Sequence, residues 1–148
     1  MRRLLPFLHL VFATTFIFSQ DLLLVGVFDL DIPSNAGKAT AVQATADIPS
    51  LSAYGLESCN NGAESGGEPE LTFPDVPLAA GEIMWFVRDA ATIQTYFGDA
   101  AVNVNGDGGN SAAVNQNGDD AILLHFKSPV LGWTPIDAFG EVGVVGSG

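Results

Sequence analysis

Four oxygen-bearing side chains in the C-terminal third of the chain are the residues best suited to chemistry. Asn117, Asp119 and Asp120 surround an Asn-Gly turn at the start of an apolar run, and Asp137 lies in the next such run. Adjacent strands could bring these acids together, and Ca²⁺ prefers six to eight oxygen ligands. The alternative is that Asp119 or Asp120 caps the turn by accepting hydrogen bonds from backbone N–H groups. The four residues are therefore a candidate calcium site with a structural role as the competing interpretation.

A second calcium-like pattern occupies residues 103–108, where oxygen-bearing side chains alternate before a glycine. An EF-hand loop needs an acidic residue at its first position and a bidentate Glu at its twelfth. The chain has Asn103 and Val114 at these positions, so an EF-hand is excluded. Calcium is the one cofactor that the sequence suggests, and nothing in the sequence requires a cofactor.

Residues and motifs typical of enzymes are scarce. Beyond residue 19 the chain has one histidine, His125, and strand alternation opposite apolar neighbours predicts a surface position for it. Zinc-binding patterns, the Gly-x-Ser-x-Gly nucleophile motif and the phosphate-binding Gly-x-x-x-x-Gly-Lys loop are missing. Cys59 is the only cysteine and has no base or cation beside it, which predicts a partly buried, unreactive thiol. We therefore predict that the chain is not an enzyme.

The first 19 residues have the composition of a secretory signal. Arg2 and Arg3 precede the apolar run Leu4–Phe18, which ends at the small residue Ser19. A single membrane anchor is the alternative, but the run contains a proline and is shorter than the roughly 20 residues that span a bilayer. We expect residues 1–19 to be a signal peptide, residues 20–148 to form one domain, and the protein to be secreted.

The mature chain would be strongly acidic. Its 17 acidic residues face only three basic ones, Lys38, Arg88 and Lys127, which gives a formal charge of −14. Nucleic-acid affinity depends largely on Lys and Arg that displace counterions from phosphates, so binding to DNA, RNA or anionic lipid is disfavoured. We expect no nucleic-acid partner and no membrane contact after signal cleavage.

Short apolar runs between turn residues predict an all-β domain. The first run is apolar throughout, which predicts a strand covered on both faces. The candidate strands are Leu22–Phe28, Ala39–Ala46, Leu51–Leu56, Glu70–Phe73, Glu82–Arg88 and the two runs near 121–126 and 135–143.

One helix is predicted over residues 90–97, with Asp89 as its N-cap and a glycine after its end. Ile93, Tyr96 and Phe97 share one face and should pack on a sheet, because so short a helix is not stable alone. Six or seven strands with one short helix indicate an antiparallel β-sandwich. Eight residues are expected in its core: Tyr54, Phe73, Ile83, Trp85, Val87, Ile122, Leu124 and Phe139.

Several motifs together resemble a lamin tail domain of the secreted kind. They occur in order along nearly the whole mature chain: Leu51–Ser58, the acidic Gly-rich loop after it, Leu71–Pro74, Leu78–Gly81, Asn117–Leu124 and Ile136–Glu141. The resemblance implies an immunoglobulin-like β-sandwich in an extracellular protein, often beside hydrolase or adhesion modules and not itself a catalyst.

The chain departs from that family pattern at two places. Ala41 replaces a Glu that similar secreted members carry, and Val145–Gly148 stands where they have Asp-Gly-Thr-Gly before a Trp-bearing final strand. A missing final strand would leave a sheet edge open, and open edges pair with other chains. We therefore expect self-association through this edge.

These observations predict a secreted, non-catalytic binding or structural module with a protein or cell-surface partner. The loops 59–69 and 99–116 are the expected partner surface. The alternatives are a fragment of a secreted nuclease or phosphatase whose catalytic domain lies beyond Gly148, and a calcium-dependent adhesion module.

Overall fold

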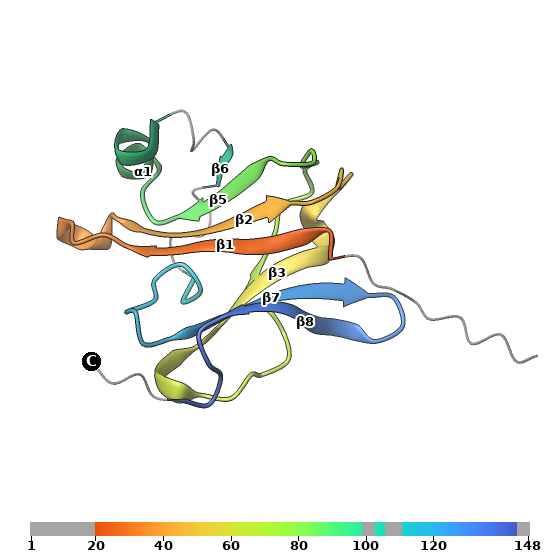
Figure 1. The fold of residues 1–148 in the computed structure, drawn as a ribbon. Coiled ribbons are helices and arrows are strands. Elements are labelled where there is room, and N and C mark those ends of the chain that lie inside the picture. The colour runs from red at the N-terminus through yellow and green to blue at the C-terminus, as the bar shows by residue number, and fades with distance from the viewer. Residues whose placement is uncertain (1–19, 99–102, 106–110, 145–148) are drawn as a thin grey trace, which may run out of the picture.

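The computed structural model describes residues 20–98, 103–105 and 111–144. The predicted signal peptide lies outside these ranges, as do residues 106–108 of the calcium-like pattern and the last four residues of the expected open edge. The described strands form two sheets packed face to face, with one short helix beside them (Figure 1). This arrangement confirms the predicted all-β sandwich with one short helix.

The first sheet has the strand order β1-β2-β5-β6. Its strands are β1 (Leu22–Asp29), β2 (Lys38–Ala44), β5 (Ile83–Val87) and β6 (Asn103–Asn105). β2 pairs antiparallel with β1 and β5, whereas β6 runs parallel to β5. A 3-10 turn, Pro33–Asn35, lies between β1 and β2.

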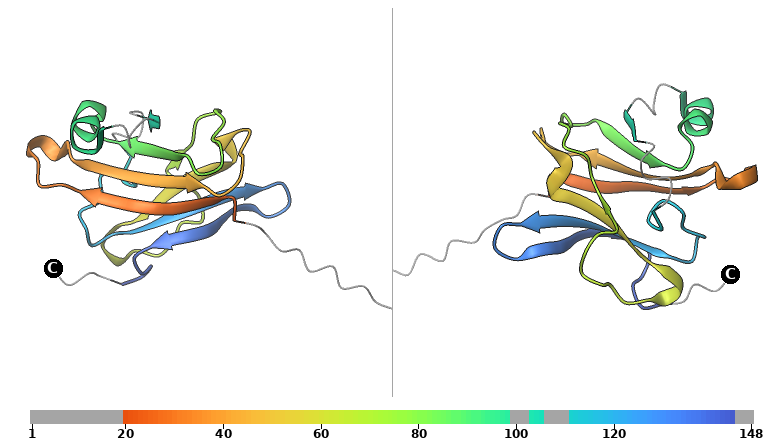
Figure 2. Two further views of the ribbon diagram at one scale, coloured as in Figure 1. Left: turned by 45° about the horizontal axis from the view of Figure 1, so that its top comes forward. Right: turned by 180° about the vertical axis from the view of Figure 1, so that it is seen from behind.

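The second sheet is antiparallel and has the order β4-β3-β7-β8. Its strands are β4 (Leu71–Thr72), β3 (Tyr54–Cys59), β7 (Ala121–Ser128) and β8 (Gly132–Phe139). Short 3-10 turns, Leu51–Ala53 and Asn60–Gly62, flank β3. The two views of Figure 2 show this sheet facing the first across the core.

Alternating apolar side chains from both sheets form the main core. Leu22 and Val42 from the first sheet meet Leu56 and Leu124 from the second. Fully burying each such side chain contributes about 1.5–3 kcal/mol to stability. The core can therefore hold the two sheets together in a chain with a single cysteine.

A second apolar cluster covers the outer face of the first sheet. The helix α1 (Ala90–Phe97) is capped by Asp89, whose side chain accepts a 2.7 Å hydrogen bond from the N–H of Thr92. The ring of Phe28 lies 5.1 Å from that of Trp85 and 5.2 Å from that of Phe97. Small alanines on β2 leave room for these rings, and the predicted helix and its cap are confirmed.

Six of the eight expected core residues are buried, and Ile83 is half-buried. Phe139 was a wrong prediction, since it is 51% exposed near the end of the edge strand β8. Tyr96 was also wrong, because it points away from the sheet and is 62% exposed. The strand β1 is covered only in part, since Leu22 faces the main core and Phe28 the outer cluster, but most of its side chains are half-buried. Within the described ranges, no helix is long and apolar enough to cross a membrane.

Candidate functional site

The loop 60–70 lies over the outer face of the second sheet. All six residues of β3 are buried, although only alternate ones face the core. A Cβ on Gly55 would lie 2.6 Å from the Cβ of Pro69 and 2.7 Å from the carbonyl oxygen of Leu71. Glycine is therefore needed at position 55 for this loop to pack on the strand.

Beneath this loop, Glu57 of β3 and His125 of β7 form a buried pair. The Nε2 atom of His125 lies 2.7 Å from Oε2 of Glu57, and the imidazole is fully buried. The carboxylate also accepts hydrogen bonds from the hydroxyl of Ser65, at 2.7 Å, and from the N–H of Gly66. One carboxylate thus joins two strands to the loop that covers them.

This arrangement shifts the pKa of Glu57. Burial raises the pKa of Glu57, but the hydrogen bonds from Ser65 and Gly66 and the interactions with His125 together lower it by more, so the net pKa is below its ordinary value. The other ring nitrogen of His125, Nδ1, is buried without a hydrogen-bond partner. A general base must reach its substrate within hydrogen-bonding distance, and this pair is sealed under the loop.

The surface position expected for His125 was wrong. Strand alternation correctly places His125 on the outer face of the sheet, opposite Gly55. The loop 60–70 covers that face, and a loop crossing a sheet leaves no periodic signal in the strand itself. A charged residue inside an otherwise apolar strand, as Glu57 is, was the one signal that could have indicated a buried pair.

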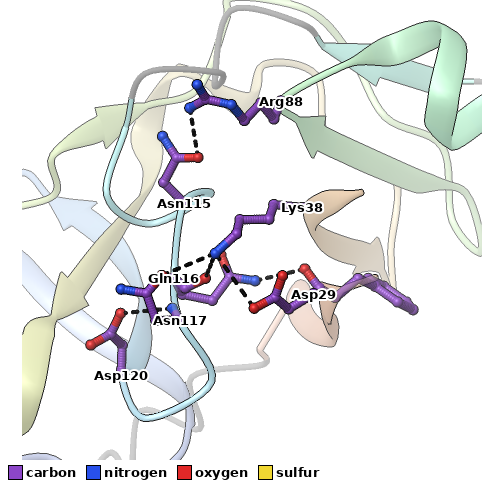
Figure 3. A network of polar contacts seen from close by, with 8 residues as sticks. Asp29, Lys38, Arg88, Asn115, Gln116, Asn117 and Asp120 are labelled. Carbon is purple, nitrogen blue, oxygen red and sulfur yellow. Dashed lines mark hydrogen bonds and ion pairs between the residues drawn. The ribbon is translucent and has the colours of Figure 1, made fainter. Parts of the chain in front are cut away.

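A second polar network fastens the segment 111–120 to the first sheet (Figure 3). Lys38 at the start of β2 is buried, and its Nζ donates to the carbonyl oxygen of Gln116 and, at 3.1 Å, to Oδ1 of Asn117. Its ion pair with Asp29 spans 3.4 Å. Lysine is almost never buried unless it is paired, so these contacts explain how Lys38 can lie inside the domain.

Further contacts hold the same segment in place. The hydroxyl of Thr40 donates to the carbonyl oxygen of Ala113 at 2.8 Å, and the side-chain amide of Gln116 donates to the carbonyl oxygen of Phe28 at 2.9 Å. Arg88 donates to the side chain of Asn115 at the same end (Figure 3). Strand β7 thus follows a segment that is tied to the opposite sheet.

Two of the four candidate calcium ligands lie in this second network. Oδ1 of Asp120 accepts from the N–H of Asn61 at 2.9 Å, and Oδ2 accepts from the N–H of Asn117 at 3.2 Å. The side-chain oxygen of Asn117 is taken by Lys38. Asp119 is half-buried between its two neighbours. Asp120 therefore caps the turn in the way that the structural alternative predicts.

The fourth candidate, Asp137, lies elsewhere on the sheet. It pairs with Leu124 across the β7–β8 ladder, four residues along β7 from Asp120, or about 13 Å at strand spacing. Its carboxylate accepts from the N–H groups of Leu24 and Ala138, both at 2.9 Å. Among the residues that the structure describes, no group of three or more His, Cys, Asp or Glu side chains is placed to hold a metal ion.

Other carboxylates bind backbone amides in the same way. Glu70 accepts from the N–H groups of Ser58 and Ala113, yet burial outweighs these bonds and raises its pKa. Asp47 accepts from the N–H of Ala80, and Glu82 from that of Ala79, both at 2.9 Å. The acidic residues thus serve as anchors for loops.

Cys59 is buried at the end of β3, as expected for an inert thiol. Burial raises its pKa, and the negative charges of Glu57, Glu70 and Glu64 raise it further. A thiol needs a lowered pKa to act as a nucleophile at neutral pH. The site offers this cysteine no such activation.

Comparisons with known proteins give no assignment. No family model matches the chain, no curated protein matches it, and no solved structure matches it.

Proposed function

We propose that the chain is a secreted, non-catalytic binding or structural module of lamin-tail type. The observation that supports this proposal most is the use of its buried charged side chains. Lys38, Glu57 and Asp120 each hold a loop against a sheet through several hydrogen bonds. Groups committed to such contacts are not free to bind substrate or transfer protons.

The leader-like first 19 residues and the acidic composition support an extracellular site of action. The ordered motifs that resemble secreted lamin tail domains support the module type. An immunoglobulin-like sandwich of this size commonly presents partner surfaces on its loops and turns.

Assays of phosphate-ester hydrolysis test the proposal against the hydrolase alternative. Purified secreted protein is incubated with a chromogenic phosphomonoester and a chromogenic phosphodiester, with and without divalent cations. We expect rates equal to the buffer blank. Turnover that His125→Asn or Glu57→Gln abolishes, in protein that keeps the wild-type far-UV spectrum, would contradict the proposal.

A further inference from the structure

The turn that joins β7 to β8 carries two strongly exposed aliphatic side chains. Val130 is 89% exposed and Leu131 is 71% exposed. In Figure 1 this hairpin extends beyond the other strands at its end of the sandwich. Moving two such side chains from water to an apolar surface is favourable.

Two backbone N–H groups of this turn have hydrogen-bond partners within the protein. The N–H groups of Val130 and Leu131 both donate to the hydroxyl oxygen of Ser128, at 3.2 and 3.3 Å. A backbone donor that enters an apolar medium is costly unless it already has a partner. The apex can therefore leave water with two of its amide donors paired.

The polarity of the hairpin changes at the second residue pair below the apex. Lys127 pairs with Trp133 across the hairpin, and its Nζ lies 5.3 Å from the centre of the Trp133 ring. Trp and Lys combine an apolar body with a polar end, and both are found at membrane–water interfaces for that reason. An aliphatic apex followed by Trp and Lys matches the polarity gradient of a bilayer surface.

The described chain begins at the same end of the sandwich. The carbonyl oxygen of Gln20 accepts a hydrogen bond from Thr45, which follows β2, and both figures show the chain entering at the end where the β7–β8 turn projects. The first described residue and the tip therefore lie at the same end of the domain.

The negative charge of the domain and the small contact area of the tip indicate which kind of partner fits it. A formal charge of −14 after signal cleavage, with Asp21 and Asp47 near this end, repels anionic lipid. Two aliphatic side chains and one Trp cover far less than the roughly 800 Å² that each partner gives to a standard protein interface. A zwitterionic lipid surface fits these features better than a second copy of the chain.

We propose that the turn 128–133 is a lipid-contacting tip that inserts Val130 and Leu131 into a zwitterionic bilayer. This inference goes beyond the proposed function. It also departs from the expectation of no membrane contact, which rested only on repulsion between the acidic chain and anionic lipid. The contact is reversible, because even a single acyl chain gives only marginal membrane binding.

Binding of the secreted protein to phosphatidylcholine vesicles at millimolar lipid tests this proposal. We expect cosedimentation with the vesicles and a blue shift of Trp133 emission. The double substitution Val130→Asn/Leu131→Asn should lower the partition coefficient by about fivefold or more without changing the melting temperature. The control Tyr96→Asn/Phe139→Asn removes exposed aromatic side chains far from the tip and should bind like the wild type.

Four results of the binding and association measurements would overturn the proposal. The wild type could fail to bind at millimolar lipid, or both double variants could bind equally. Binding could also occur only when phosphatidylserine is present, or the protein could form a lipid-free dimer that the tip variant abolishes. Trp133→Phe should keep the binding and lose most of the blue shift. A blue shift that persists in Trp133→Phe would not come from the tip, and this result would also overturn the proposal.

Discussion

At the scale of single residues, carboxylates take the place that disulfides hold in many secreted domains. The chain has one cysteine and 17 acidic residues, and several of these acids accept hydrogen bonds from backbone N–H groups of distant segments. Hydrogen bonds to charged groups contribute about 1.5–3 kcal/mol each. A few of them can therefore fix loops that no covalent bond holds.

We expect the buried carboxylate of Glu57 to contribute strongly to the stability of the folded domain. Glu57→Gln keeps the shape of the side chain but removes the charge that faces His125, and breaking a buried pair costs about 3–5 kcal/mol. We expect a loss of about 3 kcal/mol in the free energy of unfolding by urea. Glu68→Gln, an exposed change in the same loop, is the control and should cost less than about 0.5 kcal/mol. Equal losses in the two variants would show that the pair is not stabilising.

The pH dependence of stability should identify the same residue. The pKa of Glu57 is lower in the folded state, so its contribution is present above the unfolded pKa of about 4.3 and is lost as the pH falls through the folded value. Glu70 has a raised pKa and acts in the opposite direction, since its ionisation disfavours the fold. We expect the stability of Glu57→Gln, measured by urea unfolding from pH 6 to pH 3, to fall less than that of the wild type. Parallel pH curves would contradict this assignment.

Gly55 tests the packing of the loop on β3. A Cβ at this position would overlap Pro69, whereas a Cβ on Gly66 would make an ordinary 3.4 Å contact with Glu57. We expect Gly55→Ala to lower stability by about 1–3 kcal/mol, and Gly66→Ala to have a much smaller effect because its N–H is retained. Thermal melts of both variants measure the difference, and similar melting temperatures would argue that the loop packs elsewhere.

At the scale of elements, most strands and the helix could be predicted from the sequence because their signals are local. Apolar runs of strand length lie between turn residues, and Asp89 is followed by residues with helical spacing. The covered outer face could not be predicted, because the loop 60–70 meets β3 and β7 through contacts that leave no local pattern. His125 was misplaced for this reason.

Some contacts of the candidate site could also be predicted from the sequence, and others could not. Asp120 could be predicted to cap its turn, because the amide of Asn117 is three residues away. Its bond to Asn61 and the bond from Leu24 to Asp137 join segments far apart in sequence. Such partners depend on how the two sheets pack, and a single sequence gives no register between them.

Lys38 should hold the segment 111–120 to the first sheet. Lys38→Met keeps most of the side-chain volume but removes the donor to Gln116 and Asn117. We expect faster amide hydrogen exchange in residues 111–120 and little change in α1, because the hydrogen bonds lost are to that segment and none of the lost contacts involves α1. Asp29→Asn is the control, since the Asp29 side chain is 39% exposed and partly exposed ion pairs contribute little. Uniform faster exchange throughout the domain would indicate a global rather than a local role.

At the scale of the whole molecule, the edge strands β1 and β8 have features that disfavour strand pairing with another copy of the chain. Edge strand β1 has a bulge between Leu24 and Gly26, where Asp137 of edge strand β8 accepts the N–H of Leu24. β8 carries Pro135 and an irregular register beside His125. Bulges, prolines and inward charges are known protections of sheet edges. Self-association at the edge expected after residue 143 remains a prediction.

Thermal unfolding with Ca²⁺ tests whether the acidic side chains anchor loops or bind a cation. If Asp120 and Asp137 only accept backbone amides, millimolar Ca²⁺ should change the melting temperature no more than equal Mg²⁺, which controls for screening of the surface charge. A true site filled at 100 times its dissociation constant would add about 2.7 kcal/mol, or several degrees. We predict no calcium-selective shift. A calcium-specific rise that disappears in Asp120→Asn, relative to that variant's own baseline, would contradict it.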